Sequence, residues 1–230
     1  ADNDGDGVLD TTYNNNFDYY GYFDSNYCYR QNSDEVFEPK DTIDGYPLNS
    51  GHICSTRTDD WSGNFLNWVS MTRIDVVRKI LYGGLRSVDS SDQTILERSH
   101  LPNDAHSFAK YYNGRDLGKL TPFWNVRTGD NHEDSGITFC NTTIDFTVGT
   151  RSQHSTAIPL IRAARGNHSF WPAGERWQCL YKEEYPQLGK ATTNNDRWTL
   201  LSIGVNAHHE APSTEWHRIY DYHARVEACK

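Results

Sequence analysis

The first residues of the chain carry a repeating acidic pattern that is typical of calcium-binding loops. Carboxylates recur at alternate positions and a glycine follows the third one, as in the loop of an EF-hand. Because the intervening residues turn the backbone, alternate carboxylates can converge on one hard cation. The predicted ligands are Asp2, Asp4, Asp6, the carbonyl of Val8 and Asp10, with Gly7 at the sharp bend.

This loop departs from a complete EF-hand at its last ligand. Where a bidentate glutamate should stand, the sequence has Tyr13, so an isolated acidic loop, or one completed by Asp18, fits better. We expect Ca²⁺ in a structural role, with an affinity at the weak, extracellular end of the range. An acidic, solvated turn that binds no ion is the alternative.

The chain holds no residue constellation that points to catalysis. His208, His209, Glu210 and His217 are close in sequence, but they lack HExxH spacing and Pro212 interrupts them. The GxSxG elbow of serine hydrolases and the glycine-rich loops of nucleotide-binding proteins are also missing from the sequence. We therefore expect a protein without enzymatic activity; a secreted hydrolase is an alternative that no motif supports.

Five cysteines are spread along the chain without any CxxC pair. This spacing does not suit a structural zinc site, a thioredoxin-like redox pair or a haem attachment. It suits disulfides that hold long loops in an oxidising compartment. We expect the pairs Cys28–Cys54 and Cys140–Cys179, with Cys229 paired outside this chain; five reduced, buried cysteines are the alternative.

Aromatic residues are unusually frequent for so polar a chain. Only 36% of the residues are hydrophobic, yet 13% are aromatic, with 14 tyrosines and seven tryptophans. Some of these rings could form a contact surface for glycans or another protein; rings packed under long loops are an equally good interpretation. The candidate contact residues are Tyr19, Tyr20, Tyr22 and Trp171, within a wider set that adds Tyr27, Tyr29, Trp124 and Trp177.

Composition also excludes several classes of protein. The formal net charge of −9 argues against a nucleic-acid partner and against binding to an acidic membrane surface. No run approaches the roughly 18 apolar residues of a membrane span. A chain with this many aromatics should fold, and its length suits one sizeable domain. We expect either a mature secreted product or an internal piece of a longer protein.

The structural elements that position these residues are expected in three zones along the sequence. Residues 1–60 are turn-rich, residues 61–84 favour a helix, and residues 85–230 are mixed at first and then β-rich. In the mixed part, residues 91–101 favour a short helix and residues 120–131 favour a strand followed by a turn. From residue 136 onward, apolar and polar residues alternate between Gly, Pro and Asn. Without a repeat or linker, the simplest prediction is a single α+β domain over residues 1–230.

The segment "WSGNFLNWVSMTRIDVVRKILYGG", residues 61–84, has the strongest regular pattern. Ser62 or Asn64 can cap its start, and Gly83 with Gly84 can form a left-handed cap at its end. Its apolar positions follow helical spacing over a broad face, which predicts a core helix that is buried along much of its girth.

This segment resembles the signature region of the PilC/PilY family, large proteins associated with the tip of bacterial type IV pili. The tyrosine-rich "YYGYFDSNYCYR" of residues 19–30 is similar to a family segment that also carries a cysteine. Three more stretches resemble family segments in the family's order: "LERSHLPNDAHSF", "ARGNHSFWPAGERWQC" and "YHARVEAC". The resemblance thus extends over nearly the whole chain.

The resemblance implies a place within a larger protein. In such proteins the amino-terminal region looks like a von Willebrand factor A domain, and "TRIDVVRKIL" resembles the first helix of that domain. The implied fold is α+β, with a von Willebrand A-like core helix, long disulfide-stapled loop insertions and a β-rich C-terminal half. The DxSxS adhesion motif of that domain is not in this chain, so its metal site cannot be placed here.

The function that the resemblance implies is that of a type IV pilus tip adhesin or pilus biogenesis protein at the bacterial cell surface. Its expected partners are minor pilins or other pilus tip components and a host or surface receptor. A secreted carbohydrate-binding module that uses surface Tyr and Trp residues is the first alternative. A purely structural insertion that shields an adhesion domain is another.

Overall fold

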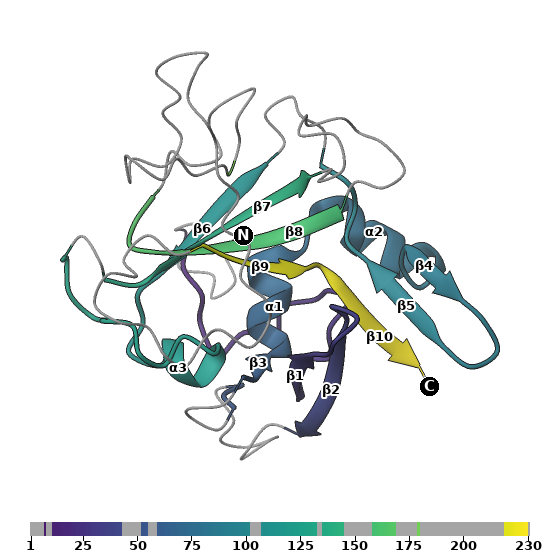
Figure 1. Cartoon of the computed structure of the whole chain (residues 1–230), viewed down its shortest axis with the longest axis horizontal. Helices are drawn as coiled ribbons and strands as arrows, with labels where there is room; N and C mark the ends of the chain where they lie inside the picture. Colours follow the sequence, from purple (N-terminus) through teal and green to yellow (C-terminus); the bar gives the residue numbers. More distant parts are fainter. Residues whose placement is uncertain are drawn as a thin grey trace, which may run out of the picture.

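The computed structural model describes residues 7, 11–42, 52–54, 59–101, 107–132, 135–144, 158–168, 179 and 219–229 (Figure 1). The helices are α1 (Gly63–Ser70), α2 (Arg73–Tyr82) and α3 (Leu117–Leu120). The strands are β1 (Tyr27–Gln31), β2 (Phe37–Thr42), β3 (Trp61–Ser62), β4 (Arg86–Asp89), β5 (Thr94–Glu97), β6 (Phe108–Tyr112), β7 (Ile137–Ile144), β8 (Ile158–Arg165), β9 (Ile219–His223) and β10 (Arg225–Cys229).

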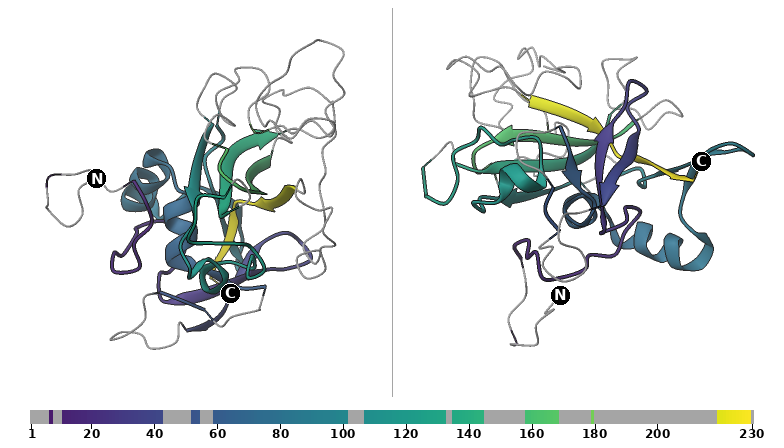
Figure 2. Two further views of the ribbon diagram at one scale, coloured as in Figure 1. Left: turned by 90° about the vertical axis from the view of Figure 1, so that its left-hand side faces the viewer. Right: turned by 90° about the horizontal axis from the view of Figure 1, so that it is seen from below.

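These strands form two sheets, and the chain crosses from one sheet to the other between β9 and β10. One sheet has the order β3-β1-β2-β10-β5-β4 and the other the order β6-β7-β8-β9. The pairings are antiparallel except for β10 with β2. Ala224 separates β9 from β10, so the chain passes directly from one sheet into the other, as the yellow strands of Figures 1 and 2 show. The described part of the chain is therefore mixed α/β and rich in strands.

Aromatic rings fill the space between the sheets. Trp61, which is 1% exposed, lies at the centre, with its ring centroid 4.8 Å from that of Tyr222 and 5.9 Å from that of Phe139. Phe37 of β2 and Phe123, which follows α3, complete this group at 6.1 and 5.8 Å from Trp61. Edge-to-face contacts of this kind stabilise a core beyond the area that they bury. Many of the excess aromatics therefore act as core residues.

The predicted helix over residues 61–84 is wrong as a single element. Trp61 and Ser62 belong to β3, and the helical part is broken into α1 and α2. Ser62 caps α1, as expected, by accepting a hydrogen bond from the amide of Phe65. Met71 ends α1 in an extended conformation, and Thr72 starts α2 with a capping box to Asp75. Thr72 thus satisfies free amides at the start of a second helix, so the sequence itself favours a break between α1 and α2. The spacing of the apolar residues alone did not reveal this break.

Burial differs sharply between these two helices. Every residue of α1 is buried, and Gly63 is needed there because a Cβ at this position would lie 2.1 Å from the carbonyl oxygen of Asp24. In α2, by contrast, Asp75 is the buried residue. The prediction of a helix buried along much of its girth is thus correct for α1 and wrong for α2. The predicted cap at Gly83 is present, with a φ of 85°.

Two predictions for the middle of the chain are also wrong. Residues 91–101 contain strand β5 instead of a short helix, because Ile95 and Leu96 pair with β10 and with β4. Residues 120–131 contain no strand; Leu120 is the last residue of the short helix α3, and bends and turns follow it. The β-rich prediction from residue 136 onward is confirmed for β7, β8, β9 and β10. Within this β-rich region, the alternating stretches at residues 176–185 and 197–205 lie outside the described residues apart from Cys179.

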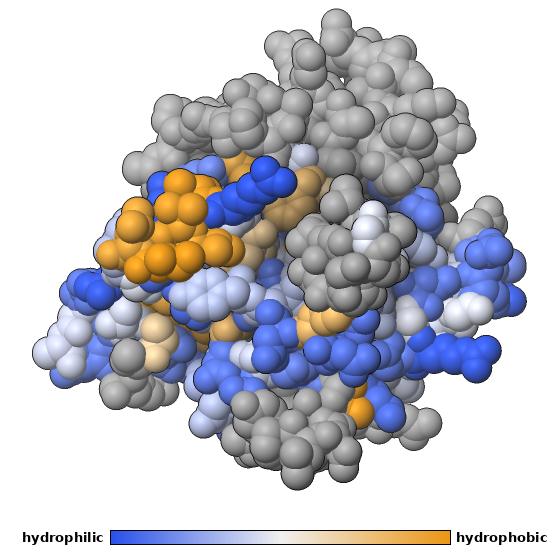
Figure 3. Space-filling model, turned by 180° about the vertical axis from the view of Figure 1, so that it is seen from behind, coloured by the Kyte–Doolittle hydropathy of each residue, from blue (hydrophilic) through white to orange (hydrophobic). Residues whose placement is uncertain are grey.

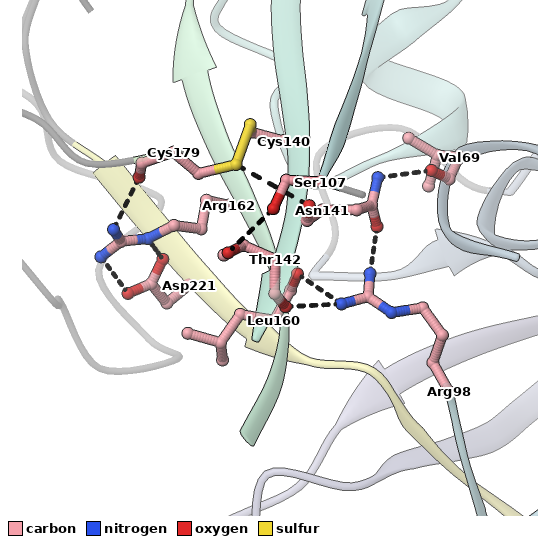
Figure 4. The surroundings of a disulfide bond; sticks show 10 residues. All are labelled: Val69, Arg98, Ser107, Cys140, Asn141, Thr142, Leu160, Arg162, Cys179 and Asp221. Carbon is pink, nitrogen blue, oxygen red and sulfur yellow. Dashed lines mark hydrogen bonds and ion pairs between the residues drawn. A yellow bond between two sulfur atoms is a disulfide. The ribbon is translucent and has the colours of Figure 1, made fainter. Parts of the chain in front are cut away.

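The buried arginine Arg98 connects the chain after β5 to strands β7 and β8 of the four-stranded sheet (Figure 4). The Arg98 side chain, fully buried, donates to the side-chain oxygen of Asn141 and to the carbonyl oxygens of Thr142 and Leu160. Burial lowers the pKa of Arg98 to about 10. Asn141 in turn donates to the carbonyl oxygen of Val69 at 2.9 Å, which connects β7 to α1.

Candidate binding surfaces

The predicted calcium ligands Asp2, Asp4, Asp6, Val8 and Asp10 lie outside the described residues. Gly7 is described and has a φ of 85°, the left-handed conformation that suits the sharp bend expected there. Elsewhere, the described part of the chain contains no group of three or more His, Cys, Asp and Glu residues able to hold a metal ion. Calcium binding therefore stays a prediction.

The two disulfides join the pairs expected from the sequence. Cys28 of β1 is bonded to Cys54, and Cys140 of β7 is bonded to Cys179. All four of these cysteines are buried. Because these bonds use four of the five cysteines, Cys229 is left without a cysteine to pair with inside the chain. Its expected pairing outside the chain stays a prediction.

The candidate contact aromatics differ in exposure. Tyr20 is 53% exposed, as a contact residue should be, and Tyr19 is half-buried. Tyr22 was expected at the surface, but it is 6% exposed, because its ring packs in the core and its hydroxyl accepts a hydrogen bond from the amide of Leu85. Trp171 lies outside the described residues. Tyr27, from the wider set, is 37% exposed.

Tyr20 and Tyr27 border a cleft of about 680 Å³ between the N-terminal segment and the end of α2. We call it the tyrosine cleft; its aromatic lining is Tyr19, Tyr20, Tyr22, Phe23, Tyr27 and Tyr29, and its charged lining is Asp18, Asp24, Lys79 and Glu227. The tyrosines stand out in the sequence by their frequency. Nothing in the sequence associates Lys79 or Glu227 with them, because helix α2 and strand β10 reach the cleft only in the folded chain.

Several hydrogen bonds hold the walls of the tyrosine cleft in place. The hydroxyl of Tyr29 accepts a hydrogen bond from the amide of Asp24 at 2.8 Å. Lys79 donates to the carbonyl oxygen of Gly21, and its ammonium lies 4.6 Å from the ring centroid of Tyr20. Burial lowers the pKa of Lys79. The cleft thus combines fixed tyrosine walls with an ammonium donor and carboxylate acceptors.

A second surface feature is an apolar face on α2. Large side chains stand on it with exposed fractions between 45% and 73%. We call it the α2 face; it consists of Ile74, Val77, Ile80, Leu81 and Tyr82. Figure 3, which shows the molecule from behind, has an orange, hydrophobic patch on its surface. In both views of Figure 2, α2 lies toward the outside of the molecule. The largest apolar patch on a monomeric protein is often functional.

An apolar groove of about 470 Å³ begins at the N-terminal end of the α2 face. Met71, Ile74, Leu101 and Phe108 supply its apolar lining. Lys110 also lines it, donates to the carbonyl oxygen of Trp68, and has a pKa lowered to about 8 by burial. The groove therefore extends the apolar surface of α2 toward the four-stranded sheet.

Comparison with known proteins identifies the family. A family model described as "PilY1 homolog, small alpha/beta domain" matches residues 10–164. The chain belongs to this family. The match runs from the N-terminal segment through nearly all of β8 and includes the tyrosine-rich segment, both central helices and β7.

Two curated relatives of this PilY1-family chain carry the name type IV pilus biogenesis factor PilY1 homolog, both from Xylella fastidiosa strain Temecula1. The first is 35% identical over 193 residues, which cover 78% of this chain and 12% of the relative. The second is 38% identical over 96 residues, which cover 40% of this chain and 8% of the relative. The chain thus spans about an eighth or less of the length of these relatives. No solved structure matches it.

The family description agrees with the mixed α/β fold of the described residues. Among those residues, no helix has the length and apolar character needed to cross a membrane. Both predicted disulfides lie within or just beyond the matched region.

Proposed function

We propose that this PilY1-family chain is one domain of a longer type IV pilus biogenesis protein at the bacterial cell surface or pilus tip. Its role there is in surface attachment or pilus assembly, without enzymatic activity. The observation that carries the proposal is the family match together with the names of the two relatives. The two disulfides support an oxidising location outside the cytoplasm.

The α2 face supports the view that the chain works as part of a larger assembly. Its five side chains expose on the order of 500 Å² together, which is near the upper range for a monomeric protein. An area of this size is small for a stable free-standing dimer but suits an interface between parts of one polypeptide, where the partner is tethered. We propose that α2 belongs to a von Willebrand A-like core that other parts of the longer protein complete.

Calcium and the external partners complete the proposal. The loop with Asp2, Asp4, Asp6, Val8 and Asp10 would hold a structural Ca²⁺ near the tyrosine-rich segment. Minor pilins or other pilus tip components, and a receptor on the colonised surface, are the proposed partners.

The proposal is tested in the pilus-bearing bacterium, with the full-length protein expressed from its own gene. Leu81→Asp and Ile80→Asp each place a carboxylate on the α2 face, where it would be desolvated by a packed partner. We expect at least tenfold fewer surface pili or attached cells in each strain. Ser33→Asp, which adds the same carboxylate to the exposed turn between β1 and β2, is the control and should behave as wild type.

Immunoblots must show the variant protein in the cell, so that loss of function is not loss of protein. Normal numbers of pili and attached cells for both α2 variants would contradict the role of this face. If deletion of the whole gene leaves piliation and attachment unchanged, the pilus function itself is refuted.

A further inference from the structure

The tyrosine cleft has the features of a site for hydroxyl-rich ligands. Two of its rings, Tyr20 at 53% and Tyr27 at 37%, are exposed at its border. Such a ring offers a flat apolar face, together with a hydroxyl that can donate or accept a hydrogen bond. Sugar rings carry an apolar C–H face and polar hydroxyls at their edges, so an exposed tyrosine matches both parts. We propose that the tyrosine cleft binds a neutral oligosaccharide, with Tyr20 and Tyr27 as its stacking platforms.

The walls of the cleft are rigid before any ligand binds. The Tyr19 hydroxyl accepts a hydrogen bond from the amide of Asn14, and those of Tyr22 and Tyr29 accept from Leu85 and Asp24. Behind them, the ring of Phe23 packs edge-to-face on Tyr29 at 5.2 Å. Because these side chains are already ordered, a ligand does not have to order them, and less binding free energy is lost.

The polar groups of the cleft fit hydroxyls, which both donate and accept hydrogen bonds. Asp24 is exposed, so its carboxylate oxygens are available as acceptors, whereas Glu227 of β10 lines the cleft but is only 7% exposed. Glu227 is held in place by a hydrogen bond from the amide nitrogen of the Gln93 side chain at 3.0 Å. The ammonium of Lys79 can donate. Acceptors and a donor thus occur within one cleft.

The charges exclude the two other ligand classes that aromatic clefts commonly bind. A cation would compete with Lys79, whose ammonium already lies 4.6 Å from the centroid of Tyr20. An anion would meet Asp18, Asp24 and Glu227, three carboxylates against one lysine. A neutral ligand avoids both conflicts. The volume of about 680 Å³ lies within the usual range for ligand sites and leaves room for a short oligosaccharide.

A neutral oligosaccharide would be the ligand through which the proposed surface attachment takes place. Support for this ligand comes from the geometry of the cleft alone. The test uses the purified 230-residue chain with neutral hexasaccharides as probes: cellohexaose, laminarihexaose, xylohexaose and chitohexaose. Isothermal titration calorimetry gives the affinity. We expect at least one probe to bind, and Tyr20→Ala and Tyr27→Ala each to weaken it at least tenfold.

Tyr82→Ala is the matched control, because Tyr82 has the same exposed fraction of 53% but stands on the α2 face. It should bind as wild type, and Tyr20→Phe, which keeps the ring but loses the hydroxyl, should weaken binding less than Tyr20→Ala does. Melting curves of all variants report whether each one is folded; Tyr27→Ala serves as the second test if Tyr20→Ala does not fold.

Three results would overturn the inference: no binding of any neutral probe, binding that is unchanged in Tyr20→Ala and Tyr27→Ala, or equal loss in Tyr82→Ala. Binding of only a cationic chitosan oligomer or an anionic uronic acid oligomer would overturn it as well. Piliation of a Tyr20→Ala strain separates this inference from the proposed function. Pili are expected to assemble normally there, whether or not the cleft binds a sugar.

Discussion

Arg162 and Asp221 face each other across β8 and β9 and form a buried, two-point ion pair. Arg162 Nε and Nη2 donate to the two carboxylate oxygens of Asp221 at 2.7 and 2.9 Å, and the side chains are 0% and 7% exposed. The third guanidinium nitrogen, Nη1, donates to the carbonyl oxygen of Cys179 at 2.7 Å. The disulfide from Cys179 to Cys140 on β7 thus places an acceptor on the buried arginine (Figure 4).

Asp221→Asn should strongly destabilise the fold. The asparagine keeps the shape of the side chain but removes the charge that compensates the fully buried Arg162, and breaking such a pair costs about 3–5 kcal/mol. Denaturant unfolding followed by tryptophan fluorescence measures the change. Asp34→Asn, at an exposed position in the turn after β1, is the control. A loss below about 1 kcal/mol for Asp221→Asn would show that the pair is dispensable.

Removal of the Cys28–Cys54 disulfide as Cys28→Ser/Cys54→Ser should lower the free energy of unfolding by roughly 3.5 kcal/mol. This bond closes a loop with a sequence separation of 26 residues, and opening it increases the entropy of the unfolded chain. Cys229→Ser is the control, because Cys229 closes no loop within the chain. Equal stability of the double variant and Cys229→Ser would mean that the loop is held by other contacts.

Buried tyrosines should make the fold unstable in alkali. Burial raises the pKa of Tyr22 and of Tyr29 to about 12 and raises those of Tyr13 and Tyr112 further, whereas unfolded tyrosines ionise near pH 10.0. The unfolded state therefore loses these protons first. Stability from the tyrosines is fully present below about pH 10 and is lost as the pH rises toward the folded-state pKa values. Denaturant unfolding across this range, with tyrosinate absorbance as a second signal, measures the loss.

Lys110 should have the opposite effect at lower pH. Its pKa falls to about 8 on burial, from 10.5, so the unfolded state binds more protons between these values and stability rises with pH there. Lys110→Met should reduce this rise to the part that Lys79 contributes, because burial lowers the pKa of Lys79 as well, and should not change the loss caused by the tyrosines at higher pH. An unchanged rise in the variant would assign it to groups other than Lys110.

Calcium should raise the melting midpoint of the chain. An ion at about 100 times its dissociation constant adds about 2.7 kcal/mol, and a domain of this length shifts by roughly 2–4 °C per kcal/mol, which gives about 5–10 °C. Asp2→Asn/Asp4→Asn/Asp6→Asn should lose the shift. The same midpoint with calcium and with a chelator would refute the calcium site.

The caps could be predicted from the sequence because they depend on local chemistry, whereas the two cysteine pairs, 26 and 39 residues apart, were expected only from the spacing of the cysteines along the chain. Ser62 and Gly83 act at the ends of helical segments for reasons that lie within a few residues. The alternation of β7 and β8 was readable for the same reason. Family membership was readable as well, since it depends on the order of short motifs along the chain.

Long-range contacts decided the rest. Residues 91–101 have helical character by themselves, but β10, far away along the chain, pairs with them as a strand. The spacing of apolar residues predicted one continuous buried face over residues 61–84. In the structure, only α1 contacts the aromatic core, and Ile80 and Leu81 of α2 are exposed. Tyr20 and Tyr22 are two positions apart in sequence and both line the tyrosine cleft, yet Tyr20 is 53% exposed and Tyr22 packs in the core at 6%. A sequence pattern states which residues can be buried, and only the packing of distant elements determines which of them are.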